Sequence, residues 1–177
     1  MHHHSTNHQN HTPQVNEPGY RLKDFLPLII IFCIIISFTL MRQWIFGWHI
    51  QKAMNDFMAG FFLIFGGFKV LNLHGFAEAY AMYDIIAKRS TAYAYAYPFI
   101  EIGLGITYLL RLYPTPVNII TLIIMLISSI GVAQELAQKR TITCACLGTV
   151  FKIPMTYVTL FEDVLMAAMA LIMLFYH

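Results

Sequence analysis

The chain has 177 residues, of which 58% are hydrophobic and 11% are charged, with a mean hydropathy of +0.62 and a net charge of +2. Soluble domains are about 45–50% apolar and 25% charged, so this composition excludes a soluble domain and predicts an integral membrane protein with a single domain. Lys and Arg never stand more than two in a row, which excludes nucleic acid as a partner.

Residues 1–24 form a polar tail that contains five of the eight histidines: His2, His3, His4, His8 and His11. Because this tail has almost no apolar side chains to bury, we predict that it is disordered. Histidine-rich tracts bind zinc, nickel or copper, so His2, His3 and His4 are candidate metal ligands. A solvated tail, or a segment added for expression, fits the same composition equally well.

The first apolar segment begins at Phe25 and continues past Trp44 to Phe46. Its length matches the roughly 20 residues that cross the hydrocarbon core of a bilayer, and tryptophans such as Trp44 and Trp48 favour the membrane interface. No small-residue cleavage site follows the segment. We therefore predict an uncleaved transmembrane anchor helix over residues 25–47 rather than a signal peptide.

The second apolar segment, residues 54–73, is rich in phenylalanine and glycine. Gly60 and Gly67 fall on one face of the predicted helix, where a neighbouring helix can approach closely. Lys69 lies near the end of the segment. Its ammonium group either reaches the lipid headgroups or pairs with a buried carboxylate.

Residues 74–90 have the pattern of a short helix at the membrane interface. One stripe of this helix is apolar and aromatic, and Asp84 and Lys88 on the polar side are spaced as an i,i+4 pair. The stripe consists of Phe76, Tyr80, Tyr83 and Ala87. Three further tyrosines predict an aromatic belt before the next span: Tyr93, Tyr95 and Tyr97.

The third predicted span, residues 97–112, carries Glu101. A carboxylate inside a membrane helix is costly enough to indicate a functional residue, and Lys69 is its expected partner inside the bundle. A structural ion pair is the favoured interpretation, because a proton relay needs a chain of further partners. The alternative of a relay stays open at this point.

Two more spans are predicted over residues 117–136 and 154–176. Glu162 and Asp163 fall in the first third of the last helix, within reach of the leaflet at which that helix begins. Methionines recur along one face of the same helix, at Met166, Met169 and Met173. Such a stripe fits packing, lipid contact or guidance of copper(I), which thioethers bind well.

A short polar interruption, residues 143–148, separates these two spans and contains Cys144 and Cys146. Positions i and i+2 of a helix point to opposite sides, so the two thiols can act as a pair only where the backbone leaves the helix. They then form a strained, easily reduced disulfide or bind copper(I) or zinc as thiolates. Small residues in a tight turn are the alternative, and Cys33 stands apart from the pair.

Five spans place the tail, residues 74–96 and residues 137–153 on one side of the membrane. That side holds seven Lys and Arg residues, and the other side holds three, Arg42, Lys52 and Arg111. The positive-inside rule therefore predicts a cytoplasmic N-terminus and cytoplasmic cysteines. A cytoplasmic thiol pair is kept reduced, which favours metal binding or a transient redox cycle over a permanent disulfide.

From about Asn55 onward the chain resembles the DoxX/MauE superfamily of small bacterial membrane proteins. The resemblance is carried by the glycine-rich residues 58–69, by residues 97–105 around Glu101, and by the Cys144-Ala145-Cys146-Leu147-Gly148 motif. It implies a four-helix membrane domain over residues 54–177 in the bacterial inner membrane. It also implies a redox-associated role in methylamine utilisation, in which the membrane protein, together with a thioredoxin-like partner, assists disulfide formation in methylamine dehydrogenase or the maturation of that enzyme.

The sequence thus predicts an all-α integral membrane bundle of five transmembrane helices and one short interfacial helix. Three functions remain open. The first is thiol–disulfide exchange by Cys144 and Cys146 with a redox partner, and the second is the handling of copper or zinc by these thiols and the tail histidines. The third is a non-catalytic subunit of a larger membrane complex. The sequence leaves enzymatic activity undecided.

Overall fold

The computed structural model describes residues 26–137 and 156–176. Every regular element within these residues is an α-helix, which confirms the predicted all-α class. The six helices are α1 (Leu26–Phe46), α2 (Ile50–Leu71), α3 (Leu73–Tyr80), α4 (Thr91–Leu110), α5 (Pro114–Ala137) and α6 (Thr156–Phe175).

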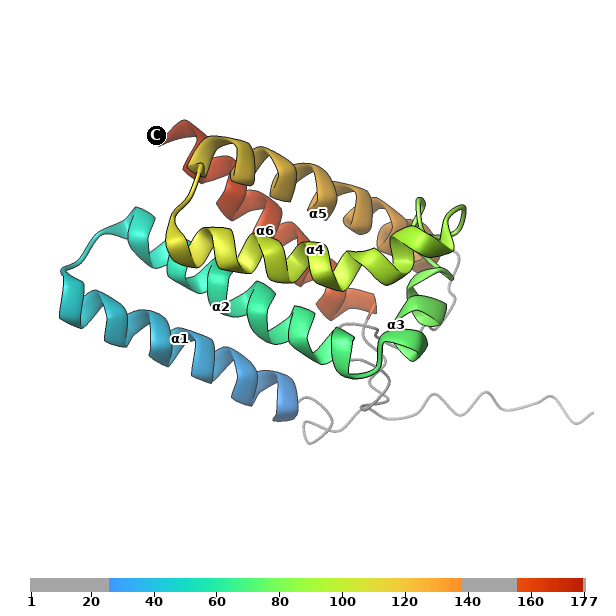
Figure 1. Ribbon diagram of the computed structural model, residues 1–177, viewed down its shortest axis with the longest axis horizontal. Helices are drawn as coiled ribbons and strands as arrows, with labels where there is room; N and C mark the ends of the chain where they lie inside the picture. The colour runs from blue at the N-terminus through green and yellow to red at the C-terminus, as the bar shows by residue number, and fades with distance from the viewer. Residues whose placement is uncertain (1–25, 138–155, 177) are drawn as a thin grey trace, which may run out of the picture.

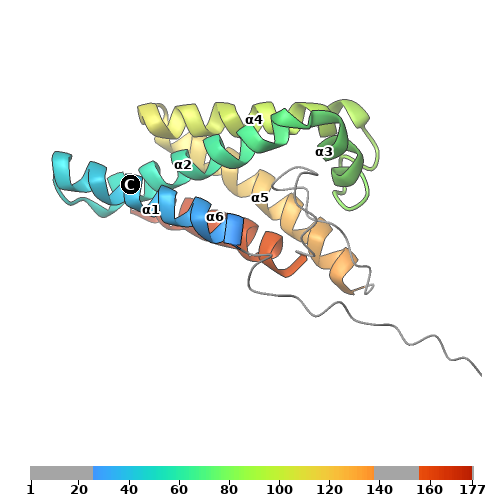
Figure 2. The same cartoon turned by 90° about the horizontal axis from the view of Figure 1, so that it is seen from below.

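The five long helices run side by side, and the chain reverses direction from each one to the next (Figure 1). The short α3 covers one end of the bundle, which we call the α3 end. The opposite end carries the last residues of α6, and we call it the C-terminal end. After a quarter turn, α2 and α4 lie together, and α5 crosses obliquely toward α6 (Figure 2).

Three of these helices are long and apolar enough to cross a bilayer: α1, α2 and residues 114–134 of α5. Together with the composition, they make the chain a membrane protein. The helices α4 and α6 have 20 residues each, which corresponds to about 30 Å at 1.5 Å per residue. The predicted count of five spans includes these two helices and stays a prediction.

The main core lies between the long helices and is rich in aromatic and methionine side chains. Phe32 of α1 packs against Phe61 and Phe65 of α2, whose rings stack with centroids 4.4 Å apart. Met166 and Met173 of the predicted methionine stripe are buried in this core, and Met169 is partly buried against it. Packing therefore accounts for the position of all three methionines.

The helix predicted over residues 74–90 is only half as long as expected. It ends at Tyr80, and turns follow over residues 81–89. The reason is Asp84, whose carboxylate accepts hydrogen bonds from the backbone N–H groups of Ile86 and Ala87 at 2.9 and 2.8 Å. A side chain that satisfies the backbone in this way stabilises a turn in place of a helix.

The helix α4 begins earlier than the predicted residue 97. Ser90 caps it by accepting a hydrogen bond from the backbone N–H of Tyr93 at 3.4 Å, and Pro98 lies inside the helix. The three tyrosines of the expected belt therefore belong to α4. Tyr97 is only 2% exposed, so it packs against protein inside the bundle.

Glycines let α2 approach its neighbours at three places. A Cβ at Gly60 would lie 3.2 Å from Ile35 of α1, and one at Gly105 would lie 2.9 Å from the side chain of Leu63. Gly66, rather than the predicted Gly67, makes the close contact with α4, because a Cβ at Gly67 would meet no atom within 4 Å. Gly60 thus makes a close contact, as expected, with α1, whereas Gly67 makes none and Gly66 contacts α4 instead.

Candidate functional site

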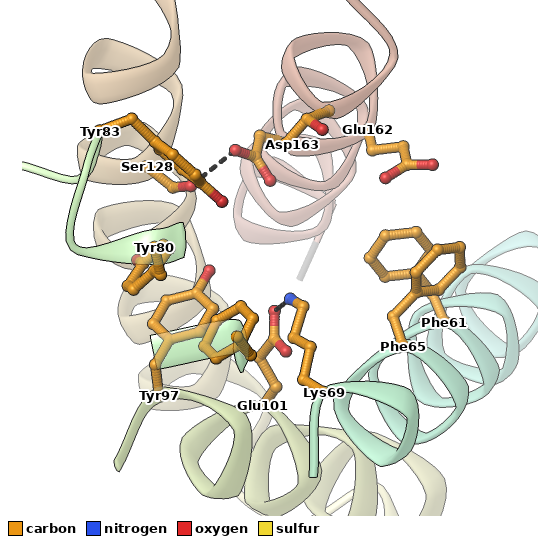
Figure 3. A pocket seen from close by; sticks show the side chains of 12 residues that line it. Phe61, Phe65, Lys69, Tyr80, Tyr83, Tyr97, Glu101, Ser128, Glu162 and Asp163 are labelled. Atoms are coloured by element: carbon orange, nitrogen blue, oxygen red, sulfur yellow. Dashed lines mark hydrogen bonds and ion pairs between the residues drawn. The ribbon is translucent and has the colours of Figure 1, made fainter. Parts of the chain in front are cut away.

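A buried group of polar side chains encloses a small cavity at the α3 end of the bundle (Figure 3). These residues come from α2, α3 and the turn after it, α4, α5 and α6, so the fold alone brings them together. We call them the polar cluster: Lys69, Tyr80, Tyr83, Tyr97, Glu101, Ser128, Glu162 and Asp163. Phenylalanine rings close the remaining wall of the cavity.

Lys69 and Glu101 form a buried ion pair between α2 and α4. The Lys69 Nζ atom lies 2.5 Å from Glu101 Oε1, and the two side chains are 9% and 3% exposed. The ammonium group also lies over the rings of Tyr97 and Phe76, 5.0 and 5.4 Å from their centroids. Its position inside the bundle, facing two aromatic rings, differs from that of a lysine that reaches the headgroups.

The last helix brings two more carboxyl groups to the same cavity. Asp163 accepts a hydrogen bond from the hydroxyl of Ser128 on α5 at 2.7 Å. Glu162 is only 2% exposed. Glu162 Oε1 and Glu101 Oε2 are both buried and have no hydrogen-bond partner within the described residues. One ammonium group therefore faces three carboxyl groups in a nearly dry environment.

The enclosed cavity has a volume of about 20 Å³. A single water molecule needs roughly 10–15 Å³ and two to four polar partners, so the cavity is large enough for one. The two unpartnered carboxyl oxygens are suitable acceptors for such a water. Carboxyl groups of α4 and α6, which are groups that can accept or release protons, thus line one cavity.

Two buried tyrosines, Tyr80 and Tyr83, lie on the α3 side of the cavity. Tyr80 donates its hydroxyl to Asp84 Oδ2 at 3.0 Å. Burial raises the pKa of Tyr80 and of Tyr83 well above its usual value, and the nearby Asp84 adds to the effect. Both phenols therefore remain protonated over the physiological range. Gly131 of α5 allows this turn to approach, because a Cβ there would lie 2.7 Å from the carbonyl oxygen of Tyr83.

A second polar group, centred on Asp56, lies at the C-terminal end and was missed by the sequence analysis. Asp56 is fully buried and faces Arg42 at 3.2 Å, Arg111 at 3.3 Å and the side-chain amide of Gln43 at 3.3 Å. The two arginines had been counted as surface charges. Asp56 itself could have indicated this polar group, because an acid within a membrane helix needs a partner, as Glu101 does.

The remaining candidate residues lie outside the described part of the chain. These are Cys144, Cys146, His2, His3 and His4. In the part that the structure describes, no group of three or more His, Cys, Asp or Glu side chains could hold a metal ion. Cys33 is a free, exposed cysteine on α1.

Comparison with known proteins identifies a protein family that matches most of the chain. The family described as "Methylamine utilisation protein MauE" matches residues 42–176. No curated protein and no solved structure matches the chain. The matched region contains all of α2 to α6, both polar groups and the Cys144-Ala145-Cys146 motif.

Proposed function

Because the chain belongs to the MauE family of methylamine utilisation proteins, we propose that it helps to mature a partner enzyme by thiol–disulfide exchange at Cys144 and Cys146. The chain itself is a membrane protein associated with methylamine utilisation. The proposal adds the chemical step and the two residues that perform it. A thioredoxin-like protein is the expected redox partner.

The observation that supports this proposal is where the polar cluster lies. Ala137 ends α5 and Thr156 begins α6, and both residues belong to the α3 end (Figure 1). The Cys-x-Cys motif is part of the chain that joins these two ends. The proton acceptors and donors of the polar cluster therefore lie at the α3 end, where the connection that carries the motif begins and ends.

The proposed step balances in electrons and protons. A thiolate of the partner attacks the Cys144–Cys146 disulfide, and one cysteine leaves as a thiolate while a mixed disulfide forms. A second partner thiol then displaces the other cysteine. The partner loses two electrons and gains a disulfide, and the cysteine pair becomes a dithiol. The disulfide of a thioredoxin-like protein then reoxidises the cysteine pair and is itself reduced. Carboxyl groups such as Glu162 accept the protons that thiols release and supply the protons that thiolates take up.

The test uses a Cys33→Ser variant, in which Cys144 and Cys146 are the remaining thiols. Membranes are treated with a permeant maleimide before and after reduction. A redox-cycling pair is expected to gain label after reduction, because part of the population is oxidised. In addition, Cys146→Ser on this background is expected to trap a mixed disulfide with the thioredoxin-like partner.

The matched control is the Cys144→Ser/Cys146→Ser double variant on the same background, which must give neither signal. Full labelling without reduction, together with no trapped adduct, would contradict the proposal. An impermeant maleimide added to intact cells then reports the side of the membrane. The charge distribution predicts protection from that reagent, because it predicts cytoplasmic cysteines.

The proposed architecture extends the three apolar helices to five spans, with α4 and α6 as the additional ones, in the bacterial inner membrane. The two other functions, metal handling and a purely structural subunit, remain predictions without a supporting observation in the described residues. Copper or zinc that copurifies in stoichiometric amounts would favour metal handling. A stable larger complex that survives loss of both cysteines would favour the structural subunit.

A further inference from the structure

Two adjoining open cavities lie at the C-terminal end of the bundle, away from the polar cluster. The first has a volume of about 290 Å³, and its polar walls are Lys52, Asn55, Arg111 and Asn118. The second has a volume of about 370 Å³ and is lined mainly by Ile50, Met54 and Ile172. Gln51, Met173 and Tyr176 line both, so the polar and the apolar cavity share one boundary.

This end of the bundle carries more positive than negative charge. Arg42, Lys52 and Arg111 lie here, and within the described residues Asp56 is the acid that faces them. Asp56 is fully buried beneath the two arginines. Its single negative charge leaves a net excess of two positive charges, which suits an anionic ligand.

The walls of the polar cavity are held in place by the fold. Arg111 ends α4 with a left-handed backbone conformation at φ 56°, and one terminal nitrogen of its guanidinium group faces Asp56 at 3.3 Å. The side-chain oxygen of Asn118 accepts a hydrogen bond from the Tyr108 hydroxyl at 2.8 Å, so the amide NH2 of Asn118 remains as a donor. Lys52 is half-buried and enters no ion pair within the described part of the chain.

Two exposed tryptophans at the C-terminal end indicate that the cavities lie near the membrane surface. Trp44 and Trp48, at the end of α1 and in the connection to α2, are 83% and 69% exposed at this same end. Exposed tryptophans of membrane proteins favour the headgroup region. A cationic cavity beside an apolar one, at this depth, matches the two parts of a phospholipid. The phosphate fits the cationic cavity, and an acyl chain fits the apolar cavity.

We propose that these two cavities form a binding site for an anionic phospholipid. The phosphate headgroup lies against Lys52 and Arg111, and the first part of an acyl chain packs against Met54 and Ile172. Binding here ties α2 to the turn between α4 and α5 and to the end of α6. The site is independent of the cysteines and of the polar cluster, so the proposed thiol chemistry and this site can fail separately.

The test compares two lipids with identical acyl chains, phosphatidylglycerol and phosphatidylcholine, by native mass spectrometry of the full-length protein. The wild type is expected to retain phosphatidylglycerol preferentially. Lys52→Gln is expected to weaken that retention about fivefold, the factor for one cation near a membrane surface. Its matched control, Arg89→Gln, removes an exposed cation at the α3 end and should leave retention unchanged.

Two further measurements separate the headgroup from the chain. Inorganic phosphate, added without lipid, is expected to raise the melting temperature less than phosphatidylglycerol does, because it leaves the apolar cavity empty. Ile172→Trp, which fills the apolar cavity, should reduce retention of both lipids. Equal retention of the two lipids, equal effects of Lys52→Gln and Arg89→Gln, or full stabilisation by phosphate alone would each overturn the proposal.

Discussion

The pairing of Lys69 with Glu101 makes each residue costly to remove alone. Both side chains are nearly excluded from solvent and lie 2.5 Å apart. Loss of one partner leaves the other charge buried without compensation, which destabilises a protein by about 3–5 kcal/mol. Replacing both by uncharged groups is much less costly.

We therefore expect Lys69→Met to lower the free energy of unfolding by about 3–5 kcal/mol, and Lys69→Met/Glu101→Gln to recover most of that loss. Denaturant unfolding in detergent micelles, followed by circular dichroism, measures both values. Glu78→Gln is the control, because the Glu78 side chain is 69% exposed and should change stability by no more than about 0.5 kcal/mol. Equal losses in the single and double variants would show that the ion pair contributes no coupling.

Sequence reasoning found the pair but not the whole site. A lysine and a glutamate within apolar helices each need a partner, and this rule connects Lys69 with Glu101 without a structure. The same rule applied to Asp56 identifies a buried acid but not its partners. Arg111 lies 55 residues away, and its position at the end of a span also fits a surface charge. The approach of Glu162 and Asp163 to Lys69 depends on the packing of α6, which periodicity does not determine.

At the scale of the elements, the contact between α2 and α4 depends on a glycine. A Cβ at Gly105 would lie 2.9 Å from Leu63 Cγ and 3.1 Å from the Leu63 backbone nitrogen. The backbone atom cannot move without shifting α2. Gly103 lies two residues earlier in the same helix, and a Cβ there would meet nothing within 4 Å.

Gly105→Ala is thus expected to destabilise the bundle by about 1–3 kcal/mol, the usual cost of overpacking. Gly103→Ala is the matched control and should be neutral or stabilising by up to about 1 kcal/mol, because alanine favours helices over glycine. Thermal unfolding in the same detergent compares the two variants. If both substitutions had the same effect, the close approach at Gly105 would not limit the packing of α2 on α4.

The apolar segments predicted the existence of every helix, and the boundaries were less predictable. Hydrophobic periodicity continues from Tyr80 to Ala87, so it indicates a longer helix than α3. The carboxylate of Asp84 overrides that pattern through local hydrogen bonds. Likewise, the third span was predicted to begin at residue 97, whereas α4 begins at Thr91, directly after the Ser90 cap.

At the scale of the whole molecule, the proposed five spans would place the two termini on opposite sides of the membrane. In that topology the excess of Lys and Arg on the N-terminal side predicts that the N-terminus and the α3 end face the cytoplasm. Green fluorescent protein fused to the N-terminus should fluoresce, and alkaline phosphatase fused after His177 should be active outside. Phosphatase fused after Ala137 is the control and should be inactive, whereas activity there would contradict the five-span topology.

The buried Asp56 also has a consequence for proteolysis. Two of its three partners, Arg42 and Gln43, belong to α1, and the third belongs to the end of α4. A protease that separated α1 from α2 and released the first helix would expose this carboxylate and leave it with Arg111 alone. A shortened chain that begins at α2 is therefore expected to be less stable and to be degraded faster by quality-control proteases.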